Sequence, residues 1–382
     1  MNSMIYLDNA ATTKIRKEVK EAMLPFLEDE YGNPSGVYEL SRNAHSALDN
    51  ARTQVAKAIG ASNAREIFFT SCGTESDNWA LVGAATASKK NHIVVSKTEH
   101  HAILHTAEFL EKMGCSVTYV SPDKYGTISL EAIKAAVRED TFLISVMLAN
   151  NEVGTINPIS QIGAFAHKNG IIMHTDAVQA VGHIPVNVAS LNVDMLSMSG
   201  HKFHAPKGVG ALYIRNGVKI DNFLNGGSQE RGRRAGTENV ASIVGMGRAI
   251  ELANAELSEE MKHTAMLRDH LQKRLISENQ GIFINGNLDN RLPGNLNIAI
   301  DGVRSDAFIF SLDTMGIACS SGSACAAGSA EPSHVLLSMG IRKELSKSVV
   351  RFSLSKYNTM DEINYTCDSI RKVIAKLRRN RY

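Results

Sequence analysis

The sequence predicts an α/β protein with a mainly parallel sheet in a large domain and a smaller α+β domain beside it. Short apolar runs alternate with helical patterns through the first two thirds of the 382 residues, which indicates a sheet covered by helices on both faces. This alternation of apolar runs and helical patterns ends at about Ala255. A chain of this length also exceeds one ordinary hydrophobic core, so a second core is expected.

Helical and apolar segments follow one another in a regular order through the large domain. Ala44, Leu48, Ala51, Val55 and Ile59 recur at helical spacing, and amphipathic stretches at Glu75–Ala87 and His101–Lys112 lie between predicted strands. The predicted strands are Glu66–Thr70, His92–Ser96, Ser116–Val120, Phe142–Leu148, Ile171–Asp176, Met195–Ser199 and Ala211–Ile214.

The smaller domain begins with a long charged helix, predicted from Leu257 to Ser277. Short strands at Asn295–Ile300 and Val349–Leu354 follow, with the segment around Cys325 between them. We expect the N-terminal dozen residues to pack against this part of the chain. The predicted boundaries are residues 14–255 for the large domain, and residues 1–13 with 256–382 for the small one.

Composition and charge exclude several classes of protein. The chain is 43% hydrophobic and 21% charged, with a formal net charge of +2, so it is expected to bind neither nucleic acid directly nor a membrane. The basic run at 371–381 fits a solvated helix end better than an RNA-binding segment. No apolar run approaches the roughly 18 residues that a membrane span needs.

The five cysteines predict a reducing environment. They are odd in number and scattered along the chain, and no signal peptide precedes them, so a cytoplasmic location is expected. His101 and His105 share one helical face, but no carboxylate completes a zinc site at recognisable spacing. We therefore expect no resident metal ion. The cysteines are Cys72, Cys115, Cys319, Cys325 and Cys367.

Cys325 lies in a run of small residues, Ser320 to Ser329, that could hardly pack into a core. A cysteine in such a run is expected on a mobile, solvent-facing loop, where its thiol is available for chemistry. Buried cysteine that packs as a small hydrophobe is the commoner case. The segment by itself leaves both interpretations open.

Three features at predicted strand ends suit a carbonyl cofactor that carries a phosphate. Lys202 follows a strand on a Gly/Pro-bounded turn, and a lysine can form a Schiff base there. Asp176 ends another strand, where a carboxylate could pair with a pyridinium nitrogen. The turn at Gly73 and Thr74 offers backbone N–H groups to a phosphate. Each feature also has an ordinary explanation when it is taken alone. Lys202 could be an exposed charge, Asp176 a helix cap and the Gly73 turn an ordinary helix start.

Ten motifs in register resemble the NifS/IscS-type cysteine desulfurases, which are class V aminotransferase-like enzymes dependent on pyridoxal 5′-phosphate (PLP). They run in order over nearly the full chain and are highly specific as a set. The motifs are Tyr6–Thr13, Gly32–Ser35, Thr74–Asn78, Thr98–His100, Ala149–Thr155, Asp176–Gln179, Ser199–Lys202, Arg234–Thr237, Ser321–Cys325 and Glu331–Leu336.

The resemblance implies a homodimer of the PLP-dependent transferase fold type I. It implies conversion of L-cysteine to L-alanine with a persulfide formed on Cys325. The sulfur would then pass to an acceptor protein, either an iron–sulfur scaffold or a tRNA-thiolation enzyme. Cys325 could also serve as a transient iron–sulfur ligand.

The same resemblance assigns roles by position. Lys202, His100 and Cys325 would be catalytic, with Lys202 bonded to PLP, His100 stacked on its ring and Thr237 reaching the phosphate of the other subunit. Asn9, Asn151 and Arg351 would bind the substrate, Arg351 through the carboxylate. The implied cofactor-binding residues are Gly73, Thr74, His100, Asn151, Asp176, Gln179, Ser199, His201, Lys202 and Thr237.

Other functions stay open at this point. A PLP aminotransferase or a selenocysteine lyase could also use Lys202, although a plain aminotransferase has no need of Cys325. A non-catalytic sulfur or metal carrier would leave Lys202, Asp176 and Gln179 unused. Ser355-Lys356-Tyr357 departs from the Gly-Arg that often follows Arg-Phe-Ser-Leu in the family, and Cys319 could intercept a persulfide or simply pack.

Overall fold

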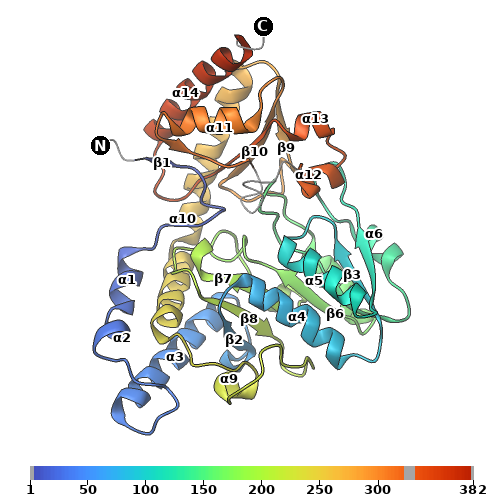
Figure 1. Cartoon of the computed structure of the whole chain (residues 1–382), viewed down its shortest axis with the longest axis vertical. Coiled ribbons are helices and arrows are strands. Elements are labelled where there is room, and N and C mark those ends of the chain that lie inside the picture. Colours follow the sequence, from blue (N-terminus) through green and yellow to red (C-terminus); the bar gives the residue numbers. More distant parts are fainter. Residues whose placement is uncertain (1–3, 322–331, 380–382) are drawn as a thin grey trace.

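The computed structural model describes residues 4–321 and 332–379. A seven-stranded sheet occupies the lower half of Figure 1, and a three-stranded sheet lies in the upper half. The large sheet has the order β2-β8-β7-β6-β5-β3-β4. Its strands are β2 (Ile67–Thr70), β3 (His92–Ser96), β4 (Ser116–Val120), β5 (Thr141–Ser145), β6 (Ile172–Asp176), β7 (Met195–Ser199) and β8 (Gly210–Ile214).

The large sheet is mainly parallel, as the alternation of strands and helices predicts. β3 pairs in parallel with β4 and β5, and the parallel pairing continues from β5 through β6 to β7. β8 alone runs antiparallel to both of its neighbours, β7 and β2. The segment from β7 to β8 is too short for a parallel crossover, so the chain turns back.

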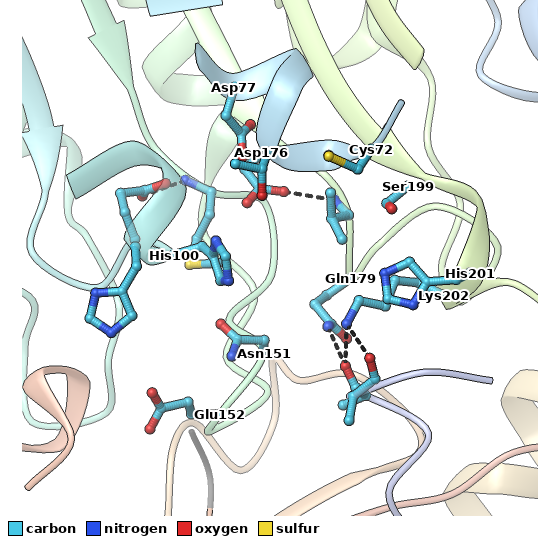
Figure 2. A pocket seen from close by; sticks show the side chains of 18 of the residues that line it. Cys72, Asp77, His100, Asn151, Glu152, Asp176, Gln179, Ser199, His201 and Lys202 are labelled. Atoms are coloured by element: carbon cyan, nitrogen blue, oxygen red, sulfur yellow. Dashed lines mark hydrogen bonds between the residues drawn. The ribbon is translucent and has the colours of Figure 1, made fainter. Parts of the chain in front are cut away.

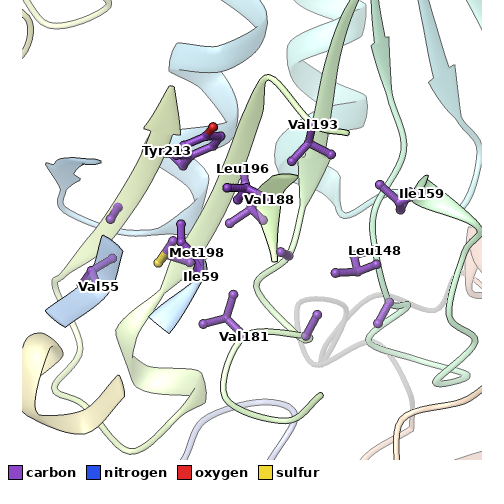
Figure 3. Close-up of a cluster of buried hydrophobic side chains, with 14 of the residues drawn as sticks. Val55, Ile59, Leu148, Ile159, Val181, Val188, Val193, Leu196, Met198 and Tyr213 are labelled. Atoms are coloured by element: carbon purple, nitrogen blue, oxygen red, sulfur yellow. The ribbon is translucent and has the colours of Figure 1, made fainter. Parts of the chain in front are cut away.

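Alternating residues of the strands supply two hydrophobic clusters, one on each face of the sheet. Ile67 and Phe69 of β2 belong to one cluster, whereas Phe68 belongs to the other, as the two-residue period of a strand requires. Figure 3 shows the first cluster, in which Val55 and Ile59 lie near Leu196 and Met198.

Helices from several parts of the chain cover these two faces. α3 (Glu39–Ala58), α7 (Ile159–Lys168) and the first half of α10 (Val240–Glu278) contribute to the first cluster. α4 (Gly73–Ala87) and α5 (His101–Lys112) contribute to the second. The shorter elements are α1 (Lys17–Met23), α2 (Pro25–Glu28), η1 (Ala64–Glu66), α6 (Leu130–Ala136), α8 (Val188–Leu191), η2 (Gly200–Lys202) and α9 (Gln229–Gly232).

A separate core lies around the antiparallel sheet β12-β10-β9. β1 pairs in parallel with β11, so the start of the chain joins this upper part. Its elements are β1 (Ile5–Tyr6), β9 (Ile282–Asn285), β10 (Asn295–Ile300), α11 (Ser305–Asp313), β11 (Ile317–Ala318), α12 (His334–Ser338), α13 (Lys343–Ser346), β12 (Val349–Ser353) and α14 (Met360–Arg379).

Two predicted segments differ from the structure. The helix expected at Leu257–Ser277 begins at Val240, after the Asn239 side chain accepts a hydrogen bond from Ser242 N–H. Its first two turns, Val240 to Gly247, hold only small and apolar residues and pack in the large core, so they lack the charged residues that mark the rest of the helix. The strand expected to reach Leu148 ends at Ser145. Beyond it, Val146 N–H and Leu148 N–H still donate to carbonyls of β6, whereas Met147 N–H donates to the Glu99 carboxyl group rather than to a neighbouring strand. No described helix has the length and apolarity that spanning a membrane would require.

Candidate active site

A cavity of about 280 Å³ lies where the carboxyl ends of the parallel strands face the upper sheet. In α/β sheets this edge is where ligands bind. The structure brings most of the predicted site residues together here (Figure 2). Those that line the cavity are Gly73, Thr74, His100, Asn151, Asp176, Gln179, Ser199, His201, Lys202 and Arg351.

Lys202 lies in the short 3₁₀ turn η2, directly after β7. Its ammonium donates hydrogen bonds to the carbonyl oxygens of Ala10, at 2.7 Å, and Ala11, at 2.8 Å. The Gln179 amide donates to the same Ala10 oxygen at 2.9 Å. The N-terminal segment therefore reaches the centre of the cavity, and Figure 2 shows these contacts between the two side chains and the chain below them.

Asp176 is the last residue of β6 and is 4% exposed. Its carboxylate accepts a hydrogen bond from Val178 N–H at 2.8 Å. Burial raises the pKa of Asp176 to about 6, while the Val178 N–H and the Lys202 charge act in the opposite direction. A cation placed against this carboxylate would keep it ionised at neutral pH.

Two further buried carboxyl groups line the same wall of the cavity, Asp77 on α4 and Glu99 before α5. Burial, together with the neighbouring Asp176, raises the pKa of Glu99 to about 8 and that of Asp77 well above its usual range. Three acids this close in a buried wall do not all ionise together. Glu99 therefore keeps its proton at pH 7, and the pKa of Asp77 is shifted in the same direction, which leaves Asp176 as the member that a cation can hold in its charged form.

His174 lies behind this wall on β6 and is fully buried. Its ring bonds the Ser145 hydroxyl at 2.9 Å and the Ser197 hydroxyl at 3.0 Å. Burial lowers the pKa of His174 to about 3, so the ring is neutral and spaces the strands β5, β6 and β7 through hydrogen bonds.

His174→Gln is expected to cost less stability in acid than at neutral pH. Between its ordinary pKa of 6.5 and its folded pKa of about 3, His174 binds a proton in the unfolded chain but not in the folded one. The wild type thus loses up to about 1.4 kcal/mol of unfolding free energy per pH unit as pH falls through this range. Chemical unfolding of both proteins at pH 7.5 and 5.5 measures their unfolding free energies. A difference between wild type and variant that is the same at both pH values contradicts the prediction.

The other end of the cavity suits an anion. α4 begins at Gly73, and its N-terminus lines the cavity together with Ser199, which ends β7, and His201 of η2. A Cβ at Gly73 would lie 2.8 Å from Val178 Cγ2, so only glycine fits. The His201 ring forms a hydrogen bond with the Thr12 hydroxyl at 3.1 Å. Burial, followed by the charge of Lys202, lowers the pKa of His201 to about 4.

His100 lies at the N-terminus of α5, where its Nδ1 accepts a hydrogen bond from Ala102 N–H at 3.1 Å. Burial lowers the pKa of His100 to about 4, and the nearby Lys202 charge adds to the shift. The ring is therefore neutral at pH 7, with its proton on Nε2 because Nδ1 acts as acceptor.

Arg351 enters the cavity from β12 of the upper sheet and is 1% exposed. Its Nη1 donates to the Asn151 carbonyl at 2.9 Å, and its Nη2 donates to Asp8 Oδ1 at 2.7 Å. A buried guanidinium beside a polar cavity suits recognition of a carboxylate.

Two predicted site residues lie outside this cavity, and a third is not among the described residues. The Asn9 amide donates to the Ser353 carbonyl at 2.9 Å and lines a smaller neighbouring cavity. Thr237 is exposed and is absent from the residues that line the main cavity. Cys325 lies outside the described residues. The roles of all three stay predictions.

Comparison with known proteins identifies the family. The family model for aminotransferase class-V matches residues 5–366. "Cysteine desulfurase IscS" of Dictyoglomus turgidum is 49% identical over 380 residues, which cover 99% of this chain and 96% of that protein. This chain belongs to the cysteine desulfurase family.

Solved structures of similar chains agree with this family. A structure described as a NifS-like protein superposes with a TM-score of 0.92 at 40% identity, covering 98% of this chain and all of the other. A second, SspA in complex with cysteine, has a TM-score of 0.81 at 35% identity, covering 93% of this chain and all of the other. The predicted family and the predicted PLP fold type I are confirmed.

Cysteine desulfurases depend on PLP, and this cavity fits that cofactor. Asp176 at one end can hold the ring nitrogen, and the α4 N-terminus with Ser199 and His201 can hold the phosphate. The missing side chain at Gly73 leaves the room that a phosphate needs beside Ser199. Lys202 lies beside His201 and Gln179 in the same cavity (Figure 2), where its amine can bond to the cofactor aldehyde.

Several residues of this desulfurase cavity were not singled out by sequence reasoning. Glu99, Asp77 and Glu152 lie inside motifs that gave the resemblance, yet nothing local shows that they are buried. His334 comes from α12, and its ring lies 4.7 Å from that of His101. No group of three or more His, Cys, Asp or Glu within residues 4–321 and 332–379 could hold a metal ion.

Proposed function

We propose that this protein is a PLP-dependent cysteine desulfurase that converts L-cysteine to L-alanine and holds the sulfur as a persulfide on Cys325. The observation that carries the proposal is a single cavity that combines Lys202, the Asp176 carboxylate and the Arg351 guanidinium. A covalent cofactor anchor, a partner for a ring nitrogen and a carboxylate clamp are the parts that amino-acid chemistry on PLP requires.

Bound PLP supplies an electron sink for the negative charge that develops at the substrate Cα. Asp176 holds the ring nitrogen in its protonated form, and Gln179 donates a hydrogen bond to the ring oxygen. The N–H groups at Gly73 and Thr74, with Ser199, His201 and the partner's Thr237, hold the phosphate. Asn151 contacts cofactor and substrate, Asn9 helps to seat the substrate, and Arg351 fixes the substrate carboxylate.

Lys202 would anchor the cofactor and would move the proton at the substrate Cα. The carbonyls of Ala10 and Ala11 give its ammonium a defined position 2.7–2.8 Å away. His100, neutral and stacked over the ring, can exchange a proton with the substrate side of the cavity. His100 needs no pH far from neutral for this role, because burial lowers its pKa to about 4 and keeps the ring uncharged.

The sulfur transfer requires a thiolate. Cys325 loses its proton and attacks the substrate sulfur, and the new S–S bond forms as the C–S bond breaks. The electron pair of the broken bond stays with the carbon skeleton, which takes up a proton and leaves as alanine. Cys325 is then a persulfide, ready for a thiol acceptor.

A homodimer is part of the proposal. The segment that carries Thr237 is tied to the start of α4 by the Arg234–Glu75 ion pair of 2.7 Å, yet Thr237 itself is exposed. Leu27, Tyr31 and Val37 form a set of large apolar side chains that are 61%, 73% and 89% exposed, more than a free surface favours. A second copy would cover them, and its Thr237 would complete the phosphate site.

The acceptor and the setting are inferred from chemistry. A protein thiol of an iron–sulfur scaffold or of a tRNA-thiolation enzyme would take the sulfur, and Cys325 could ligate a cluster in passing. The reduced cysteines fit the cytoplasm. We also propose domain limits at residues 14–255, and at 1–13 with 256–382, which divide α10 between the two cores.

The test is incubation of the purified PLP-loaded protein with L-cysteine and a thiol reductant. Alanine and sulfide should appear in equal amounts, and size measurement should give twice the mass of one chain. Ammonia and pyruvate in place of alanine would indicate a lyase, and no consumption of L-cysteine would overturn the proposal.

A further inference from the structure

Asp8 lies against the side chain of Arg351. Its Oδ1 accepts a hydrogen bond from Arg351 Nη2 at 2.7 Å. Arg351 lines the cavity, whereas Asp8 does not. The carboxylate therefore contacts the guanidinium without itself lining the cavity.

Hydrogen bonds between the N-terminal segment and β12 hold Asp8 next to Arg351. Asp8 forms a parallel bridge with Ser353 on β12, and Asn9 N–H donates to the Ser353 carbonyl at 3.1 Å. Ala10 N–H also donates to the Ser353 hydroxyl at 2.8 Å. Arg351 and Ser353 point to the same side of β12, since they are two residues apart. Asp8 is thus held beside Arg351 by the strand pairing itself.

The Arg351 guanidinium is held on two sides by this chain. Asn151 O accepts from Nη1, while Asp8 accepts from Nη2. Only Asp8 is charged, and charge-assisted hydrogen bonds are the stronger ones. Two neighbouring groups respond to both members of the pair. Burial raises the pKa values of Tyr6 and Cys319, the negative charge of Asp8 raises them further, and the positive charge of Arg351 lowers them. Asp8 and Arg351 thus act as one ion pair.

We propose that Asp8 is a positioning residue that orients Arg351 for the α-carboxylate of the substrate and thereby sets selectivity for amino acids over simple amines. The inference rests on the proposed function, because it takes Arg351 as the carboxylate clamp. Asp8 acts on ligands only through Arg351. Its loss weakens the binding of ligands that carry a carboxylate and leaves other amines unaffected.

The experiment compares the PLP-loaded wild type with Asp8→Asn and Asp8→Ala. L-Alanine and ethylamine are each titrated while the absorption of the bound cofactor is followed. Ethylamine has the amino group of L-alanine but no carboxylate. Asp8→Ala should weaken L-alanine binding by about 10- to 100-fold, the value of a hydrogen bond to a charged group. Asp8→Asn keeps an acceptor oxygen and should therefore lose less affinity for L-alanine than Asp8→Ala. Ethylamine binding should be unchanged in both variants.

Asp368→Ala is the matched control. It removes a carboxylate that pairs with Arg274 at 2.9 Å on the far helices α14 and α10, and it should leave the L-alanine titration unchanged. Equal L-alanine affinity in wild type and Asp8→Ala overturns the proposal, as does an equal loss for ethylamine.

The proposed function fails by a different observation. It fails if the wild type makes no alanine from L-cysteine, whatever the Asp8 variants do. A wild type that binds L-alanine no better than ethylamine overturns the clamp, and the role of Asp8 with it.

Discussion

Cys325→Ala is expected to abolish alanine and sulfide production from L-cysteine while the purified variant still binds PLP. Loss of a covalent nucleophile lowers turnover by about 10³-fold or more. Alanine is measured under single-turnover conditions, and the visible absorption of the cofactor is recorded with and without L-cysteine. The spectrum should still respond to L-cysteine, because binding precedes the sulfur transfer.

Cys319→Ala is the matched control for this experiment. Cys319 lies on the same stretch of chain, six residues earlier, and packs against the core of the upper sheet. Burial, followed by the charge of Asp8, raises the pKa of the Cys319 thiol to about 12, so it stays protonated and cannot intercept a persulfide. This variant should retain activity. Activity in Cys325→Ala, lost only when Cys319 is also replaced, would reassign the sulfur-accepting role.

Lys202→Ala is expected to lose the covalent link to PLP and to lower desulfuration by about 10²- to 10⁴-fold, the usual contribution of a general acid–base group. The cofactor can still be held by Asp176 and the phosphate site, so reduced but measurable PLP binding should remain. Borohydride reduction followed by mass measurement checks the link. It should attach the cofactor to the wild-type chain and leave the variant chain unmodified.

Lys207→Ala provides the comparison for Lys202. Lys207 lies five residues further along the same turn, is exposed and does not line the cavity. Its removal should leave both the covalent link and the activity intact. Cofactor attached to the Lys202→Ala chain after reduction would refute the assignment of the anchoring lysine.

Most of the fold follows from local patterns in the sequence. The seven strands of the large sheet were predicted to within a few residues, because buried parallel strands are short, continuous apolar runs. The start of α10 was missed because its first two turns, Val240 to Gly247, are small and apolar all round, which gives no amphipathic period. The antiparallel direction of β8 depends on the short turn after β7, which also carries Lys202.

The sequence predicted where the site residues lie along the chain better than it predicted what surrounds them in the folded protein. Lys202, Asp176 and the Gly73 turn each end a strand or start a helix, and such places can be found in a sequence. Their alternatives, an exposed lysine and a capped helix, are excluded only when the strands meet at one cavity. Asp8 and His334 lie far from these residues in the sequence, so no spacing could have placed them beside Arg351 and His101.

The sequence by itself determined the fold class, the family and the residues that supply the chemistry, because apolar periodicity and ordered motifs are local properties of the chain. The tertiary structure decided the charge of those residues. His100 and His174 are neutral, Glu99 keeps its proton, the pKa of Asp77 is raised well above its usual range, and Asp8 is the ion-pair partner of Arg351. Protonation depends on burial and on charges contributed by distant segments, and only the folded chain brings those segments together.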